Sequence, residues 1–140
     1  MAGTITVQLR QISAATSEAA IRDHSVLVDR PAAKGGTDAG PMGGELFLAS
    51  VGGCFMSNLL AAIKARDAKV ANLRVEVTGS LADAPARFAT VSLHVTADYE
   101  DREVFEKLVE IADRGCIMMN TLRGIVDIRI DSTQPISTEP

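Results

Sequence analysis

The chain has 140 residues, 46% of them hydrophobic and 23% charged, a composition typical of one globular domain and not of a disordered chain. A net charge of −4, without any run of Lys or Arg, argues against a duplex-binding surface, because such a surface must neutralise phosphates, and we expect no nucleic-acid partner. The chain has four Phe, one Tyr and no Trp, so its core must consist mainly of aliphatic side chains. Such a core buries less area per residue, and a dimer interface would add buried area.

The amino terminus, MAGTITVQLRQ, has no long apolar segment behind a basic start, so it does not resemble a signal peptide. We therefore expect a cytoplasmic protein, in which a permanent disulfide is unusual. The most apolar run, Leu46 to Ile63, contains Ser50, Ser57 and Asn58 and is about 18 residues long, at the short limit for crossing a bilayer. We interpret this run as a buried core helix and expect no membrane partner.

Residues 1–31 predict two strands joined by a turn. TITVQLRQIS alternates apolar and polar residues, and HSVLVDRP is a second strand that Pro31 ends. AATSEAA, between them, predicts the turn region. These segments together predict a hairpin or a meander at the amino terminus.

Residues 32–67 predict a loop followed by a long central helix. AAKGGTDAGPMGG is a loop of about a dozen residues rich in Gly and Pro, long enough to suggest a function. Glu45 lies in the first helical turn, where its charge suits the helix dipole. The helix is apolar nearly all round as far as Phe55 and becomes charged at Lys64. This pattern predicts a first half buried on all sides and a second half that reaches solvent.

Residues 70–131 predict a β-hairpin, two helices and a last strand. NLRVEVTGSL and RFATVSLHVTADY both alternate, with ADAPA as the turn between them. DREVFEKLVEIADRG predicts an amphipathic helix with Val104, Leu108 and Ile111 on one face. CIMMNTLRG predicts a short helix that Gly124 closes, and IVDIRID predicts a strand.

These elements come in blocks of strands and helices, which indicates an α+β fold with antiparallel strands and a long buried central helix. The sequence contains no repeat and no sign of a second domain, so residues 1–140 predict a single domain. Residues 132–140, STQPISTEP, predict a frayed tail.

Two cysteines, Cys54 in the long helix and Cys116 at the start of the short one, are the candidates for chemistry. They allow three interpretations: inert core atoms, a permanent disulfide, or a reactive pair that cycles between thiols and a disulfide. Gly52 and Gly53 cost about 2 kcal/mol relative to alanine inside a helix. Such a cost makes sense if a backbone, Cys116, a substrate or a neighbouring helix must come close. A helix start also favours the thiolate of Cys116. The local sequence thus favours the reactive pair.

These stretches, in this order, resemble the OsmC/Ohr family of thiol-dependent peroxidases. The resemblance rests on GGTDAGPMGGELFLASVGGC, NLRVEVTG, PARFATVSLHVTADYEDREVFEKLVEIADRGC and NTLRGIVDIRI, between residues 29 and 130. Its most specific parts are the ELFLASVGGC block and the second cysteine at a later helix start. GPMGGELFLASVGGC looks most like the OsmC-like branch, and less like the organic hydroperoxide resistance proteins proper.

The resemblance implies an intertwined homodimer with two sites at the subunit interface. Cys54 matches the peroxidatic cysteine of the family, and Cys116 matches the resolving cysteine. The implied reaction is the reduction of an organic hydroperoxide or hydrogen peroxide, through a sulfenic acid on Cys54 and a Cys54–Cys116 disulfide. An external thiol or dithiol then reduces the disulfide. No metal, haem or flavin cofactor is implied, and the two histidines lack the short spacing of zinc ligands.

One departure from the family pattern concerns the residues that support the first cysteine. Family members use an Arg from the amino-terminal segment and a Glu ten positions before that cysteine. Here that position is Gly44, and Glu45 stands nine positions before, as in the OsmC-like branch. One residue rotates a helical side chain by about 100°, so Glu45 is either the carboxylate that orients the Arg or a charge at the helix start. The candidate arginines are Arg10, Arg22 and Arg30.

A second departure follows Cys116, where many members continue with Pro and this chain has Ile117. Both departures leave an alternative open: a non-catalytic protein of the same fold that holds a small apolar or acyl ligand beside Cys54. The alternative predicts thiols of ordinary reactivity and a ligand that survives purification.

Overall fold

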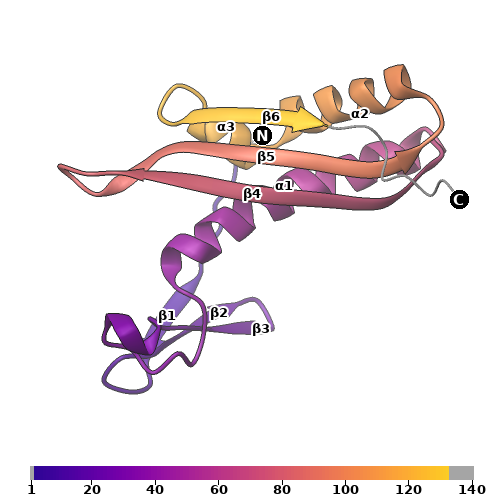
Figure 1. Ribbon diagram of the computed structural model, residues 1–140. Helices are drawn as coiled ribbons and strands as arrows, with labels where there is room; N and C mark the ends of the chain where they lie inside the picture. The colour runs from indigo at the N-terminus through magenta and orange to yellow at the C-terminus, as the bar shows by residue number, and fades with distance from the viewer. Residues whose placement is uncertain (1, 133–140) are drawn as a thin grey trace, which may run out of the picture. The chain divides into compact units, whose positions relative to one another are not determined.

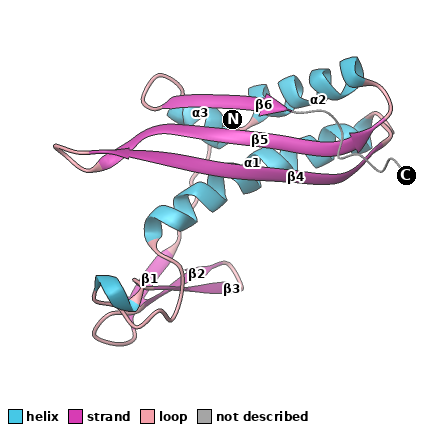
Figure 2. Ribbon diagram, in the orientation of Figure 1, coloured by secondary structure: helices cyan, strands magenta, loops and turns pink. Residues whose placement is uncertain are grey.

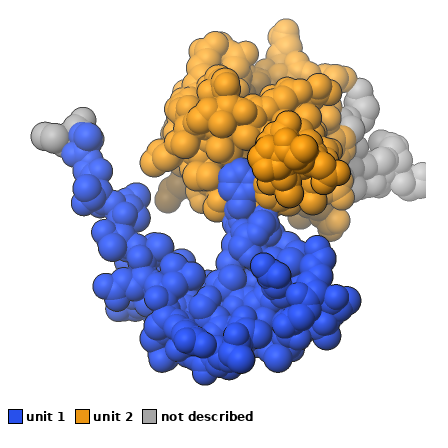
Figure 3. All heavy atoms as spheres, turned by 90° about the vertical axis from the view of Figure 1, so that its left-hand side faces the viewer, with its two compact units in different colours: residues 1–47 blue, residues 48–140 orange. Residues whose placement is uncertain are grey.

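The computed structural model describes residues 2–132, and the chain divides into two compact units, residues 1–47 and 48–140 (Figures 1 and 3). The long helix α1, Gly43–Ala65, begins in the first unit and continues in the second. Among the described residues, the strands form two three-stranded sheets, which with the helices confirm the predicted α+β class. The predicted tail lies outside the described residues, except for Ser132, which ends the last strand.

The sheet of the first unit is an antiparallel meander in the order β1-β2-β3. Its strands are β1 Gln8–Gln11, β2 Ser17–Ile21 and β3 His24–Val28. The prediction of a turn over AATSEAA is therefore wrong, because most of that segment is β2. Alanine has little strand propensity of its own. Ala19 belongs to a strand because it pairs with Leu9 on one side and Val26 on the other.

The Gly- and Pro-rich loop after β3 is organised around the buried carboxylate of Asp29, and it includes the short 3₁₀ helix η1, Ala32–Lys34. Asp29 Oδ2 accepts hydrogen bonds from Thr37 Oγ1 at 2.6 Å and from Thr16 Oγ1 at 3.0 Å. The backbone N–H groups of Arg30 and Ala39 also donate to this carboxylate. The hydrogen bond from Thr37, helped by these other donors, outweighs burial and holds the pKa of Asp29 well below its usual range.

The sheet of the second unit contains β4 Val70–Ala82, β5 Arg87–Tyr99 and β6 Asp127–Ser132. β4 and β5 form the predicted antiparallel hairpin, with Val77 opposite Leu93. β6 pairs with β5 in parallel, so the prediction of antiparallel strands is wrong for this strand. The reason is the crossover through α2 and α3, which returns the chain to the end where β5 begins.

The core of the second unit lies between its sheet and its helices (Figure 2). Its largest fully buried side chains come from α1, β5 and the later helices with their junction: Val51, Phe55, Leu59, Val91, Leu93, Val95, Phe105, Leu108, Cys116 and Met119. Gly52 allows α1 to approach β4, because a Cβ at this position would lie 2.6 Å from Val77 Cγ2. Gly53 has no neighbour within 4 Å of such a Cβ. The close approach that the two glycines suggested therefore needs only Gly52.

Within the single chain, α1 is buried on one face only. In its first half, Val51 and Phe55 are buried, whereas Ala49 and Gly53 are exposed, and Leu60 further along is 52% exposed. The prediction that its first half is buried on all sides is thus wrong for one chain, since a helix that is apolar all round needs a cover on every face. Among the described helices, α1 alone has the length and apolar character to cross a membrane, a property that core helices also have.

The helix α2, Arg102–Gly115, is amphipathic and buries Leu108 as predicted, but Val104 and Ile111 are not among its buried residues. Phe105, Leu108 and Ala112 face the core, while Val104 is 43% exposed. The ring of Phe105 stacks on Tyr99 with 4.6 Å between centroids, which turns Phe105 inward and Val104 outward. The short helix α3, Ile117–Leu122, follows directly, and Gly124 with a φ of +88° closes it as predicted.

Candidate active site: a pair of cysteine thiols

The second unit brings the two cysteines together. Cys54 lies in the middle of α1, and Cys116 lies at the junction between α2 and α3. Their Sγ atoms are 3.1 Å apart, and the thiol of Cys116 donates to Cys54. Because a disulfide bond is about 2.05 Å long, the two residues are free thiols that need to move by about 1 Å to become bonded.

Local chain geometry places Cys116 at this junction. Cys116 is the N-cap residue of α3, with an extended backbone at φ −84° and ψ 119°. Its N–H donates to the carbonyl of Asp113, and its carbonyl accepts from the N–H of Asn120. These two bonds join the end of α2 to the start of α3, so the first N–H groups of α3 lie beside the sulfur atoms.

The thiol of Cys54 is the acidic member of the pair. Burial alone would raise its pKa, but hydrogen bonds from the backbone N–H of Met118, from the Cys116 thiol and from the backbone N–H of Ile117 together lower the pKa below its ordinary value. A negative sulfur at this point receives donors that are fixed by the backbone of α3. This is the environment of an activated cysteine.

The thiol of Cys116 behaves in the opposite way. Burial raises its pKa most, and the neighbouring Cys54 raises it further, so Cys116 stays protonated when Cys54 ionises. The prediction that a helix start favours the thiolate of Cys116 is therefore wrong. The start of α3 instead favours the thiolate on Cys54, which sits opposite the N–H groups of Ile117 and Met118.

The two thiols also differ in accessibility. Cys116 is completely buried, whereas Cys54 is half-buried and can be reached from outside the chain. Ile117, the residue after Cys116, is 67% exposed and offers apolar surface next to the pair. A reagent in solution therefore reaches Cys54 before Cys116.

Glu45 belongs to the first unit, where it caps the start of α1. Its Oε1 accepts a hydrogen bond of 2.8 Å from the N–H of Met42, the residue just before the helix. This is the reciprocal bond of a capping box. It accounts for Glu45 as a charge at the helix start, and the role of orienting an arginine stays a prediction.

The three candidate arginines also belong to the first unit. Arg10 forms an exposed ion pair with Glu18, at 2.8 Å between Nη2 and Oε1. Arg22 occupies the turn between β2 and β3, with a φ of 54°. Arg30 follows Asp29 and is exposed. Which of these three, if any, supports Cys54 stays a prediction.

Sequence reasoning missed a group of polar side chains around Cys116. Arg123 pairs with Asp113, and its Nη1 donates to Asn120 Oδ1 at 3.0 Å. The amide of Asn120 in turn donates to the carbonyl of Arg114 at 3.0 Å. The sequence carries no clear signal for these contacts, because Asp113 and Arg123 are separated by the end of α2, Cys116 and the whole of α3. Within residues 2–132, no group of three His, Cys, Asp or Glu side chains is arranged to hold a metal ion.

Together, the fold and the thiol pair define an α+β protein whose candidate site is a pair of cysteine thiols at the start of a short helix. The model of the OsmC-like protein family matches residues 35–131. The chain therefore belongs to the OsmC-like protein family. The comparison with curated proteins gives no match.

Solved structures of this family share the fold. An OsmC-like protein from Mycoplasma pneumoniae has a TM-score of 0.84 at 17% identity, over 96% of this chain and 99% of that one. An organic hydroperoxide resistance protein from Elizabethkingia anophelis has a TM-score of 0.75 at 21% identity, over 96% and 99%. The organic hydroperoxide resistance protein OhrB of Bacillus subtilis has a TM-score of 0.71 at 26% identity, over 94% and 98%.

Proposed function

We propose that this protein is a thiol-dependent peroxidase that reduces organic hydroperoxides or hydrogen peroxide. The observation that carries the proposal is the contact of 3.1 Å between the sulfur atoms of Cys54 and Cys116. The lowered pKa of the Cys54 thiol supports it, because the thiolate is the nucleophile. The names of two structural neighbours, both organic hydroperoxide resistance proteins, point to the same class of substrate.

The proposed cycle has three steps. The Cys54 thiolate attacks the O–O bond of the peroxide, takes one oxygen as a sulfenic acid, and releases an alkoxide or hydroxide that takes up a proton. The thiol of Cys116 then attacks the sulfenic sulfur, which forms the Cys54–Cys116 disulfide and releases water. An external thiol or dithiol reduces the disulfide by exchange and is itself oxidised to a disulfide.

The environment of each thiol suits its step. Cys54 is the accessible thiol, so it meets the peroxide, and the N–H donors of α3 stabilise its negative charge. Cys116 is buried and protonated beside it, so it does not react with the peroxide and reacts only after Cys54 has become a sulfenic acid. We propose further that the protein acts in the cytoplasm as a homodimer without a bound cofactor, and that Glu45 and one amino-terminal arginine assist Cys54.

Steady-state turnover tests the proposal. The protein is mixed with an organic hydroperoxide and excess dithiol, and consumption of the peroxide is followed with Cys54→Ser as the control. Saturable consumption that depends on Cys54 supports a peroxidase. Consumption no faster than that of the dithiol alone would overturn the proposal.

The second candidate is a non-catalytic protein that binds a small apolar or acyl ligand. It is favoured by the capping bond of Glu45, because this bond engages the carboxylate that would otherwise be available to orient an arginine. Native mass spectrometry of the purified protein separates the two candidates. A bound apolar molecule together with slow thiols favours the binding protein, whereas a bare protein with turnover favours the peroxidase.

A further inference from the structure

Three side chains tie together the two helices on either side of Cys116. Arg123, just after α3, pairs with the carboxylate of Asp113 near the end of α2. The same guanidinium donates to Asn120 Oδ1, and Asn120 Nδ2 donates to the carbonyl of Arg114. The contacts begin two and three residues before Cys116 and end four and seven residues after it. They therefore form a closed set of contacts, called the ring below, between residues on both sides of Cys116 in the sequence.

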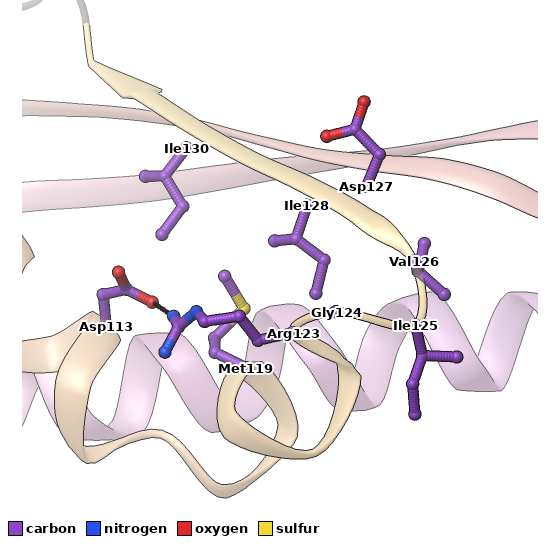
Figure 4. Close-up of a pocket in the computed structure, with 9 residues that line it drawn as sticks. All are labelled: Asp113, Met119, Arg123, Gly124, Ile125, Val126, Asp127, Ile128 and Ile130. Carbon is purple, nitrogen blue, oxygen red and sulfur yellow. Dashed lines mark hydrogen bonds and ion pairs between the residues drawn. The ribbon is translucent and has the colours of Figure 1, made fainter.

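The ring matters because α3 has little stability of its own. It has six residues, and an isolated helix needs about 12 residues or more to be stable in water. Its position depends on side-chain contacts such as these. Figure 4 shows the guanidinium of Arg123 pointing to Asp113 beneath β6, beside the side chains of Met119 and Ile128.

We propose that Arg123 is a positioning residue that, through Asp113 and Asn120, holds the start of α3 so that Cys116 stays within bonding reach of Cys54. The proposal rests on the proposed function to the extent that the Cys54–Cys116 disulfide is part of the working cycle. Its consequence is kinetic. Loss of the ring should slow the formation of the disulfide more than the first reaction of Cys54, which loses only part of its N–H donors from α3.

A step that needs no peroxide isolates this effect. Oxidised glutathione reacts with the Cys54 thiolate to give a Cys54–glutathione mixed disulfide and one glutathione thiolate. The Cys116 thiolate then attacks Cys54 Sγ, forms the Cys54–Cys116 disulfide and displaces the second glutathione. Intact-mass spectra taken over time distinguish the reduced protein, the mixed disulfide and the internal disulfide.

The variants are Arg123→Met, which keeps side-chain length and removes the guanidinium, and Arg123→Lys, which keeps the charge opposite Asp113. Arg129→Met is the matched control, because Arg129 pairs with Asp127 at 2.7 Å on β6 and lies outside the ring. Asp113→Asn removes the negative charge that pairs with Arg123, and it replaces Arg123→Met as the test variant if Arg123→Met does not fold. Thermal unfolding verifies the fold of each variant.

We expect Arg123→Met to slow the second step by about tenfold, since small misplacements of reacting groups cost factors of this size. Its first step should slow by a smaller factor, because Cys54 stays in α1 and loses only part of its N–H donors from α3. Arg123→Lys should recover part of the second step, Asp113→Asn should slow it, and Arg129→Met should leave it unchanged. A folded Arg123→Met with a wild-type second step would overturn the proposal. An equal loss in Arg129→Met, or an equal slowing of both steps, would also overturn it.

This design separates the inference from the proposed function. If the wild type forms the internal disulfide with glutathione but does not react with hydroperoxides, the peroxidase proposal fails and the role of Arg123 is still decided by the variants. If it reacts with hydroperoxides and Arg123→Met closes the disulfide at the wild-type rate, the inference fails and the peroxidase proposal stands.

Discussion

Asp29 in the first unit and Cys54 in the second are ionisable groups whose pKa is lowered by fixed hydrogen-bond donors, yet the two regions differ in what surrounds the charge. Asp29 is 4% exposed, and hydroxyl and backbone donors occupy its carboxylate. Cys54 is half-buried, and one of its donors is a second thiol. The comparison shows that fixed hydrogen-bond donors stabilise a loop when the negative group is buried, as at Asp29. The same kind of donors favour a reactive thiolate when the group is accessible, as at Cys54.

The largest expected effect comes from removing the thiol of Cys54. Cys54→Ser should lower peroxide turnover by about a thousandfold or more, because the loss of a nucleophile has effects of that size. Cys116→Ser keeps the nucleophile and a donor hydroxyl, so Cys54 should still react once with peroxide and then remain a sulfenic acid or become over-oxidised. Trapping with a sulfenic-acid reagent measures this. Equal turnover in the wild type and Cys54→Ser would contradict the account.

A second prediction concerns the glycine that lets α1 approach β4 just before Cys54. Gly52→Ala places a Cβ 2.6 Å from Val77 Cγ2, and such overpacking costs about 1 to 3 kcal/mol in the free energy of unfolding. Gly53→Ala is the matched control, since its Cβ meets nothing within 4 Å in the chain. Denaturant unfolding measures both variants. Equal stability in the two variants would show that Gly52 is not needed for this packing.

The donors of α3 provide a third and smaller test, at Ile117. Ile117→Pro removes one N–H from Cys54, and Pro suits the first position of a helix. The extended backbone of Cys116 is also compatible with a following proline. Alkylation of Cys54 at neutral pH should slow by about tenfold, the usual effect of losing one hydrogen bond to a charged group. Ile117→Val keeps the N–H and should react like the wild type, so equal rates in the two variants would refute this role of the N–H.

The smallest effect is expected at Asp29, and only in acid. The folded-state pKa of Asp29 is lowered, so its contribution to stability is present above the ordinary carboxyl pKa of about 4 and is lost as the pH falls towards the folded-state value. Asp29→Asn should lower the melting temperature at pH 7 and flatten its decline in acid. Thermal unfolding from pH 7 downwards measures this, and an unchanged acid profile in Asp29→Asn would contradict it.

Part of this molecule could be predicted from the sequence because the signals are local. The alternation of apolar and polar residues in β4 and β5 predicts the hairpin, and Gly124 predicts the end of α3. The two cysteines with their flanking residues predict the candidate site. The placement of Glu45 in the first turn of α1 is confirmed for the same reason.

The remainder depends on contacts that no local pattern specifies. The parallel pairing of β6 follows from the path of α2 and α3, and the inward face of α2 follows from the stacking of Phe105 on Tyr99. The division of acidity between the thiols depends on where the N–H groups of Ile117 and Met118 point. The pairing of Asp113 with Arg123 depends on the junction at Cys116 and on α3, which together bring residues ten positions apart into contact.

The most direct test of the account is intact-mass analysis of the reduced protein, before and after one equivalent of an organic hydroperoxide and again after a dithiol. The account predicts a rapid loss of two hydrogen atoms that the dithiol reverses, with peptide mapping that places the bond between Cys54 and Cys116. An unchanged mass over minutes would contradict it, because thiols 3.1 Å apart with an acidic, accessible member would then be inert towards peroxide.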